Sequence, residues 1–164
     1  MKKELLVRKN TRLKGYDYST AGYYFITMCV KDKHEMLGRV VGDAVHSVPQ
    51  VDLSEYGNIV QQILENGGAP CIKLEKYIIM PNHIHMILIV SHVEKRDAVD
   101  SVPYKSLIPT FVRSLKTMAS KQIGFSIWQR SYYDRVIRDE AEYQRIWQYI
   151  DENPARWAED DYFV

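Results

Sequence analysis

Two histidines, His83 and His85, lie two positions apart within an apolar run. In a β-strand alternate side chains point to the same face, so this spacing would place both imidazoles on one side of a sheet. Neutral imidazole is a common metal ligand, and two on one face can share an ion. Two histidines that only make hydrogen bonds at a sheet rim would give the same pattern. Spacing alone therefore leaves both interpretations open.

A tyrosine and an amide, Tyr149 and Asn153, lie four positions apart near the other end of the chain. In a helix this spacing places them one turn apart on one face. A phenol next to a metal site is a candidate nucleophile, and an amide is a candidate ligand. The structural alternatives are an aromatic on a core-facing stripe for Tyr149 and a helix-terminus residue for Asn153.

The elements that must position these residues indicate an α+β domain. Strands are expected at 23–30, 72–80 and 83–90, and short strands or an extended bend at 125–128 and 132–137. Helices are expected to begin at Ser54, Ser106 and Asp139. Segment 37–51 is expected to be a loop or a short irregular strand, and 92–104 a surface excursion. This order predicts a mostly antiparallel sheet with helices packed against it, similar to the ferredoxin-like arrangement. A chain of 164 residues is expected to form a single domain, 1–164.

The composition, 46% apolar and 26% charged, is typical of a soluble globular protein. No apolar run of about twenty residues is present, so no membrane-spanning segment is expected. The charged N-terminal residues do not match an export signal. Cys29 and Cys71 lie in apolar, strand-like runs, which favours a reducing compartment and a cytoplasmic location.

The formal net charge of +1 does not mark the chain as a dedicated nucleic-acid binder. The basic residues are unevenly distributed, however. Within the first fourteen residues Glu4 is the only acidic residue, against Lys2, Lys3, Arg8, Lys9, Arg12 and Lys14. This basic arm is compatible with a solvated tail and with phosphate contacts.

Six segments spread over nearly the whole chain form an ordered set: 12–19, 22–27, 80–85, 111–116, 127–134 and 137–154. Together they resemble the single-tyrosine transposases of the His-hydrophobic-His (HUH) superfamily. Within it, the chain is most similar to the branch associated with repetitive extragenic palindromes (REPs). The resemblance implies the HUH endonuclease fold, a ferredoxin-like α+β arrangement.

The resemblance also implies roles for individual residues. His83 and His85 would bind a divalent metal ion, Mg²⁺ or Mn²⁺, and Tyr149 would be the nucleophile. Asn153 would complete the metal site, where the insertion-sequence enzymes have Gln. The implied activity is cleavage and rejoining of single-stranded DNA through a 5′-phosphotyrosine intermediate.

The implied partner is single-stranded DNA, often with a hairpin, and the protein would be a monomer or a homodimer. Candidate phosphate contacts are Arg12, Lys14, Arg113, Lys116, Arg135 and Arg138. Three alternatives remain. They are a noncatalytic single-stranded nucleic-acid-binding module derived from a transposase, a replication or mobilisation nicking enzyme, and a metal-dependent hydrolase that forms no covalent adduct.

Overall fold

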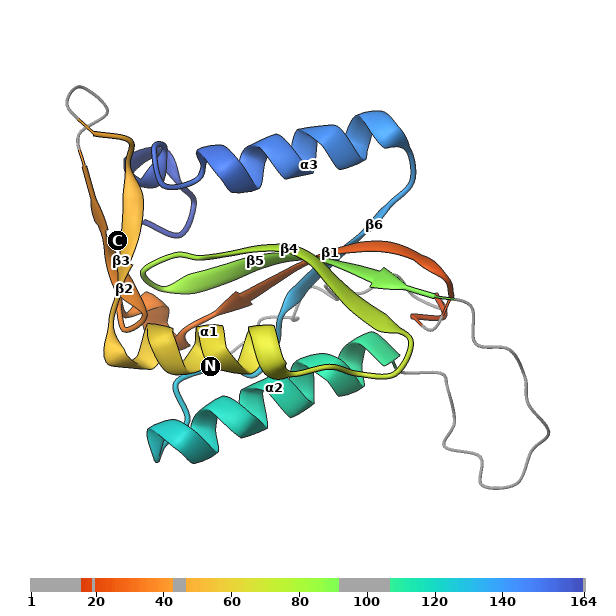
Figure 1. Ribbon diagram of the computed structural model, residues 1–164, viewed down its shortest axis with the longest axis horizontal. Helices are drawn as coiled ribbons and strands as arrows, with labels where there is room; N and C mark the ends of the chain where they lie inside the picture. The colour runs from red at the N-terminus through yellow and green to blue at the C-terminus, as the bar shows by residue number, and fades with distance from the viewer. Residues whose placement is uncertain (1–15, 19, 43–46, 92–106, 164) are drawn as a thin grey trace, which may run out of the picture.

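The computed structural model describes residues 16–18, 20–42, 47–91 and 107–163. Its centre is an antiparallel sheet with the strand order β4-β5-β1-β6 (Figure 1). The strands are β4 (Ile72–Ile79), β5 (His83–Val90), β1 (Gly22–Cys29) and β6 (Tyr133–Ile137). Their aromatic and β-branched residues suit a pleated, buried surface. Because β1 pairs with both β5 and β6, its residue Thr27 lies opposite His85 on one side and Tyr133 on the other.

Helices cover both faces of this sheet (Figure 1). Helices α1 (Glu55–Asn66) and α2 (Leu107–Ile123) lie on one face, and α3 (Glu140–Glu152) lies on the other. The period of two along β5 divides its side chains between the two layers. Ile84, Met86 and Leu88 join the larger core with α1 and α2, whereas Ile87 joins the smaller core beneath α3. His83 and His85 therefore share the α3 face with Ile87.

Side-chain caps fix where two of the helices begin. Ser54 Oγ accepts a hydrogen bond of 3.1 Å from the backbone N–H of Gly57 at the start of α1. Asp139 Oδ1 accepts one of 2.7 Å from the N–H of Glu142 at the start of α3. Each cap satisfies a donor that the first turn leaves unpaired, as the sequence predicted for both helices. Helix α3 ends at Glu152, two residues before Pro154.

The sequence-based expectation for 37–51 was only partly correct. Strands β2 (Gly38–Val41) and β3 (Gln50–Leu53) form a separate two-stranded antiparallel hairpin. An ion pair of 3.1 Å between Arg39 and Asp52 joins directly opposed residues of this hairpin. Four-residue strands are too short to show a clear alternation in sequence.

Of the two segments expected to be short strands or an extended bend, 132–137 contains β6, and 125–128 contributes only an isolated bridge between Val30 and Trp128. Short 3₁₀ helices occur at η1 (Lys31–Lys33) and η2 (Trp157–Glu159). The expected excursion at 92–104 lies outside the described residues. The α+β prediction itself, a mostly antiparallel sheet with helices packed against it, is confirmed.

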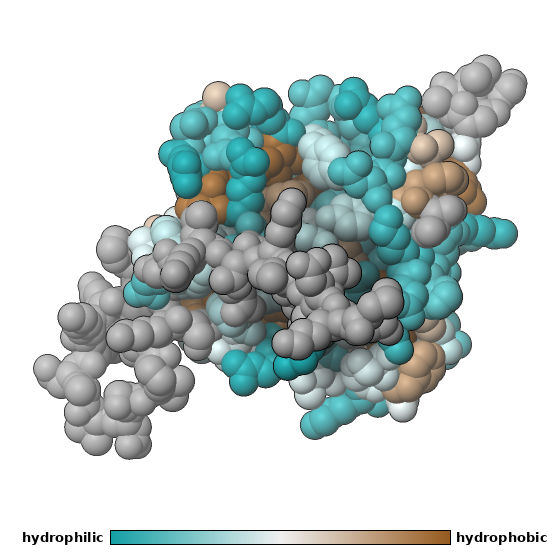
Figure 2. Space-filling model, turned by 180° about the vertical axis from the view of Figure 1, so that it is seen from behind, coloured by the Kyte–Doolittle hydropathy of each residue, from teal (hydrophilic) through white to brown (hydrophobic). Residues whose placement is uncertain are grey.

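Figure 2 shows the molecule from behind, where hydrophilic residues cover most of the coloured surface and hydrophobic ones form separate small patches. Among the described residues, no helix combines the length and hydropathy needed to cross a bilayer.

Candidate active site

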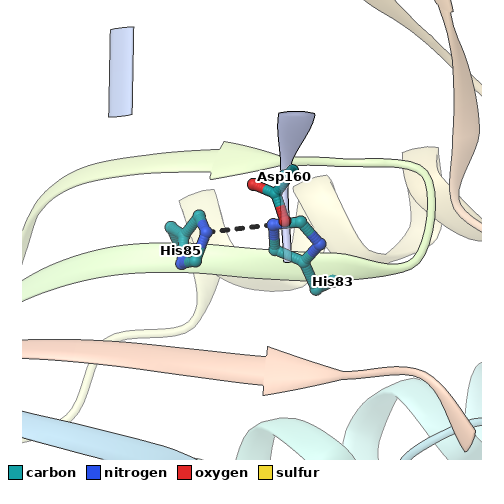
Figure 3. Close-up of side chains that lie close together, drawn as sticks. All are labelled: His83, His85 and Asp160. Carbon is teal, nitrogen blue, oxygen red and sulfur yellow. Dashed lines mark hydrogen bonds between the residues drawn. The ribbon is translucent and has the colours of Figure 1, made fainter. Parts of the chain in front are cut away.

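The two imidazoles predicted to face one way do so, and they touch. His83 Nε2 and His85 Nε2 lie 3.0 Å apart at the start of β5 (Figure 3). Their exposed fractions are 0% and 1%. Both rings lie on the face of the sheet that α3 covers, and the alternation of a strand is what brings them together.

The hydrogen bonds of Asn82 determine which nitrogen of His83 carries the proton. Asn82 Nδ2 donates to the carbonyl oxygens of Lys33 at 3.0 Å and Tyr162 at 2.8 Å. Its Oδ1 must then be the atom that faces His83 Nδ1 at 2.9 Å. Because an amide oxygen only accepts, His83 Nδ1 is the donor. The lone pair of neutral His83 is therefore on Nε2 and points toward His85.

Thr27 is the corresponding partner of His85. Its Oγ1 lies 2.8 Å from His85 Nδ1, across the β1–β5 pair, and both residues are buried. A hydroxyl can donate or accept. Thr27 can therefore donate to Nδ1 while His85 Nε2–H bonds to His83, or accept from Nδ1–H and leave the lone pair of Nε2 available to a ligand.

Tyr149 reaches the same place from helix α3. Its Oη lies 3.1 Å from His85 Nε2, and 38% of the residue is exposed. The next residue, Ile150, is 1% exposed and packs into the core beneath α3 with Ile87. Burial of Ile150 sets the rotation of the helix, so that the phenol lies beside the imidazoles while one edge stays open to solvent. Tyr149 is therefore not one more aromatic on the core-facing stripe of the helix.

Asn153 lies one turn after Tyr149 and is 1% exposed. Its Nδ2 donates to Asp160 Oδ2 at 3.0 Å. Its Oδ1 is buried and has no hydrogen-bond partner within the described part of the chain. A buried carbonyl oxygen without a partner is energetically costly, and a bound ligand or ion would remove that cost.

Sequence reasoning missed Asp160. Its Oδ2 accepts from Tyr149 Oη at 3.3 Å as well as from Asn153, and its Oδ1 accepts from the N–H of Tyr162 at 2.7 Å. Figure 3 shows this carboxylate next to the ring of His83. The segment after α3 brings it there through η2, and Trp157 and Tyr162 place their rings 5.9 and 4.5 Å from that of His83. No periodic pattern marks residues 155–163, so the sequence carried no signal for this return.

Burial controls the protonation of the site. It lowers the pKa of His83 to about 4 and that of His85 well below its usual value, so both imidazoles are neutral near pH 7. Burial also raises the pKa of Tyr149 to about 12, and the negative charge of Asp160 acts in the same direction. The phenol is therefore protonated at neutral pH unless a cation offsets that carboxylate.

The donor set fits a divalent cation. One ligand atom from each of His83, His85 and Asp160 lies within 4.8 Å of the others. Asn153, the residue directly after α3, bonds to Asp160, and its buried carbonyl oxygen has no partner in the described part of the chain. Two neutral imidazoles, a carboxylate and an amide oxygen together can hold a metal ion, with Tyr149 at its edge. The structure thus brings all four predicted residues together and adds Asp160.

Comparison with known proteins identifies the family. The family model described as "Transposase IS200 like" matches residues 18–153, which span the whole sheet, both histidines, Tyr149 and Asn153. The chain belongs to this family. The match confirms the resemblance drawn from the ordered sequence segments.

Two relatives of this chain occur in Haemophilus influenzae. One, of uncharacterised function, is 33% identical over 174 residues, covering 96% of this chain and 93% of the relative. A second, provisionally named a REP-associated tyrosine transposase, is 22% identical over 144 residues, covering 85% of this chain and 74% of its own length.

The fold also matches that of a solved structure of a REP-associated tyrosine transposase bound to a REP hairpin. The TM-score is 0.59 at 16% identity, over 89% of this chain and 73% of the other. The α+β arrangement predicted from the sequence is thus found in a transposase of this group.

Of the basic residues predicted to contact DNA, Arg135 lines a hollow together with Tyr149 and His85. The others lie elsewhere or outside the described residues. Arg113 and Lys116 are on α2, across the sheet from Tyr149, and line a hollow of about 980 Å³. The ammonium of Lys116 donates to the carbonyl oxygens of Gln129 and Ser131 at 2.7 and 2.8 Å. Arg138 is exposed just before α3, and Arg12 and Lys14 lie outside the described residues.

Proposed function

We propose that this protein is a metal-dependent transposase or endonuclease of single-stranded DNA, which cuts and rejoins strands through a 5′-phosphotyrosine made by Tyr149. The observation that carries the proposal is the position of Tyr149 Oη, 3.1 Å from His85 Nε2 and 3.3 Å from Asp160. A nucleophile must lie next to the groups that activate it and bind its target, and here one chain supplies both.

In this proposal His83, His85, Asn153 and Asp160 would hold the cation, Mg²⁺ or Mn²⁺. Once bound, it would act as a Lewis acid toward a phosphate oxygen and favour ionisation of the nearby phenol. Asn82 and Thr27 orient the two imidazoles through their Nδ1 atoms. Asp160 Oδ2 is placed to accept the proton that leaves Tyr149 Oη.

The proposed strand transfer conserves the number of phosphoester bonds. Tyr149 Oη forms a bond to phosphorus, and the bond from phosphorus to the 3′ oxygen of the preceding nucleotide breaks. That oxygen takes up a proton and leaves as a 3′ hydroxyl, while the 5′ phosphate stays on the enzyme. Attack by another 3′ hydroxyl reverses the step and rejoins DNA without ATP.

We propose that Arg113, Lys116 and Arg138, together with Arg12 and Lys14, contact phosphates away from the cleavage site. Support comes from the hollow along α2, whose lining among the described residues includes the basic residues Arg113, Lys116, Lys121 and Arg130 and no acidic one. A surface of this charge attracts a polyanion in a salt-dependent way. A hairpin-containing strand is the proposed partner, and the solved relative carries a REP hairpin.

The test is to trap the covalent intermediate. Labelled single-stranded hairpin DNA is incubated with the full chain and Mn²⁺ or Mg²⁺, and the mixture is denatured and separated by size. We expect label on the wild-type protein, none on Tyr149→Phe, and none in EDTA. Tyr143→Phe is the matched control, because Tyr143 lies on the same helix but packs against Tyr23 and Trp147.

Other outcomes separate the alternatives. Binding without label or cleavage in the wild type would favour a noncatalytic binding module. Cleavage without label would favour a hydrolase. Label that persists in Tyr149→Phe would contradict the assignment of the nucleophile.

A further inference from the structure

Tyr149 separates two hollows, and the proposed metal site accounts for only one of them. The metal-side hollow, about 290 Å³, is lined by His85, Thr27, Tyr162 and their neighbours. The second, about 240 Å³, lies between α3 and the β6 edge of the sheet. Phe25, Arg135 and Tyr149 line both. The other residues of the second hollow are Glu142, Arg145 and Ile146.

Regular spacing on two elements builds this second hollow. On the sheet, Arg135 of β6 lies directly opposite Phe25 of β1, so both side chains are on the α3 face. On the helix, Glu142, Arg145 and Tyr149 recur at intervals of three and four residues and share a face. Because β6 is an edge strand, the hollow lies at an open margin of the molecule.

The two hollows differ in charge. The metal-side hollow contains two carboxylates, Asp134 and Asp161, against the shared Arg135, and this excess of negative charge suits a site for a cation. The second hollow contains two guanidinium groups, Arg135 and Arg145, and one carboxylate, Glu142. It therefore carries an excess of positive charge, which attracts an anion.

Both carboxylate oxygens of Glu142 accept hydrogen bonds from within the protein. It is 6% exposed, its Oε2 accepts the N–H of Arg138 at 3.0 Å, and its Oε1 accepts from Arg135 Nε. These bonds and the two guanidinium groups hold the pKa of Glu142 below its usual value. The Arg135 side chain, fixed through Nε, is still 68% exposed. A guanidinium that is oriented by a bond at Nε and exposed at its other nitrogens can bind a phosphate.

The floor of the second hollow is apolar. Phe25 stacks on His85 with ring centroids 5.2 Å apart and meets Tyr149 edge-on at 6.2 Å. Ile146 lies beside it on α3. An apolar floor under two guanidinium groups matches a nucleotide, which presents a flat base or a sugar together with an anionic phosphate.

We propose that the cleft formed by Arg135, Arg145, Phe25 and Ile146 binds the phosphodiester backbone of the DNA strand immediately next to the phosphate that Tyr149 attacks. This inference rests on the proposed function and adds the path of the strand. The DNA runs over the Tyr149 ring, with the scissile phosphate on the side of the imidazoles and the neighbouring phosphate between Arg135 and Arg145.

The test measures binding without cleavage. Binding of a fluorescent single-stranded oligonucleotide to the full chain is followed by anisotropy in EDTA over a series of salt concentrations. We expect Arg145→Gln to weaken binding about tenfold at low salt and to reduce the slope of log K against log salt by about 0.7, the value for one phosphate contact on a single strand. Arg135→Gln should act similarly.

Arg39→Gln is the matched control, because Arg39 is also an exposed arginine paired with a carboxylate, but on the separate β2–β3 hairpin. Arg145→Gln is expected to fold normally, because the cap and core contacts of α3 do not involve this side chain. Unfolding curves are recorded for every variant.

The outcomes separate this inference from the proposed function. Wild-type affinity and slope in Arg145→Gln, or an equal loss in Arg39→Gln, would overturn the cleft assignment and leave the nucleophile test untouched. Failure of the wild type to bind single-stranded DNA would overturn both proposals.

Discussion

Tyr149 Oη and His85 Nε2 lie 3.1 Å apart within one chain, although 64 positions separate the two residues in sequence. One comes from a strand and the other from the last α-helix, on the face of the sheet opposite α1 and α2.

The first prediction concerns metal binding. A cation that binds only the folded protein, present at about a hundred times its Kd, stabilises it by about 2.7 kcal/mol. For a chain of this size, Mn²⁺ should then raise the Tm by roughly 5 to 10 °C. His83→Leu should abolish the shift, because leucine offers no ligand atom. His34→Gln, at an exposed histidine, should keep it. Thermal unfolding with and without EDTA measures both, and an unchanged shift in His83→Leu would refute the site.

The second prediction concerns Thr27. A metal ion needs the lone pair of His85 Nε2, so the proton must be on Nδ1, where Thr27 Oγ1 is the acceptor. Thr27→Val keeps the shape and removes that acceptor, and the Kd for Mn²⁺ should rise by about 10- to 100-fold. Thr27→Ser keeps the hydroxyl and should bind nearly as the wild type does. Calorimetric titration measures the affinity directly. Equal affinities for the valine and serine variants would show that the hydroxyl does not orient the imidazole.

The third prediction concerns pH. The pKa of His83 falls from 6.5 to about 4 on folding, so between these values the unfolded chain binds more protons. The free energy of unfolding should therefore decrease as the pH falls through this window, by about 1.4 kcal/mol per pH unit for one proton. Buried His85, whose pKa is also lowered, adds to the slope. Denaturant unfolding in EDTA should show a shallower dependence in His83→Leu than in the wild type or His34→Gln. If the free energy of unfolding depended on pH equally in His83→Leu and in the wild type, the lowered pKa of His83 would not be the cause.

The fourth prediction concerns Asp160. Its charge contributes to raising the pKa of Tyr149 to about 12. Asp160→Asn should lower that pKa in the metal-free protein. The measurement is an ultraviolet titration, read as the difference between proteins with and without Tyr149→Phe. The same variant should also bind Mn²⁺ more weakly, because it loses a charged ligand. Glu159→Gln, at the exposed neighbouring residue, should change neither property. A Tyr149 pKa that does not move would exclude Asp160 as its electrostatic partner.

Regular periods made much of the site predictable from sequence. A period of two placed His83 and His85 on one face, and a four-residue interval placed Tyr149 and Asn153 on another. Both caps at Ser54 and Asp139 were also predictable, because a cap depends on residues only three positions away.

The remaining contacts depend on tertiary structure. Thr27 meets His85 only because β1 and β5 pair in one particular register, and single residues carry no mark of that register. Asp160 returns to the site through an irregular segment held by packing of Trp157 and by the Asn82–Tyr162 bond. Neither contact has a local sequence signature.

Ile150 of α3 packs into the same small core as Ile87 of β5. Helix α3 therefore packs on the sheet of its own chain, and the phenol of Tyr149 lies beside the imidazoles of the same polypeptide. A solitary copy possesses the nucleophile and every proposed ligand, so the turnover of each molecule should be unaffected by dilution.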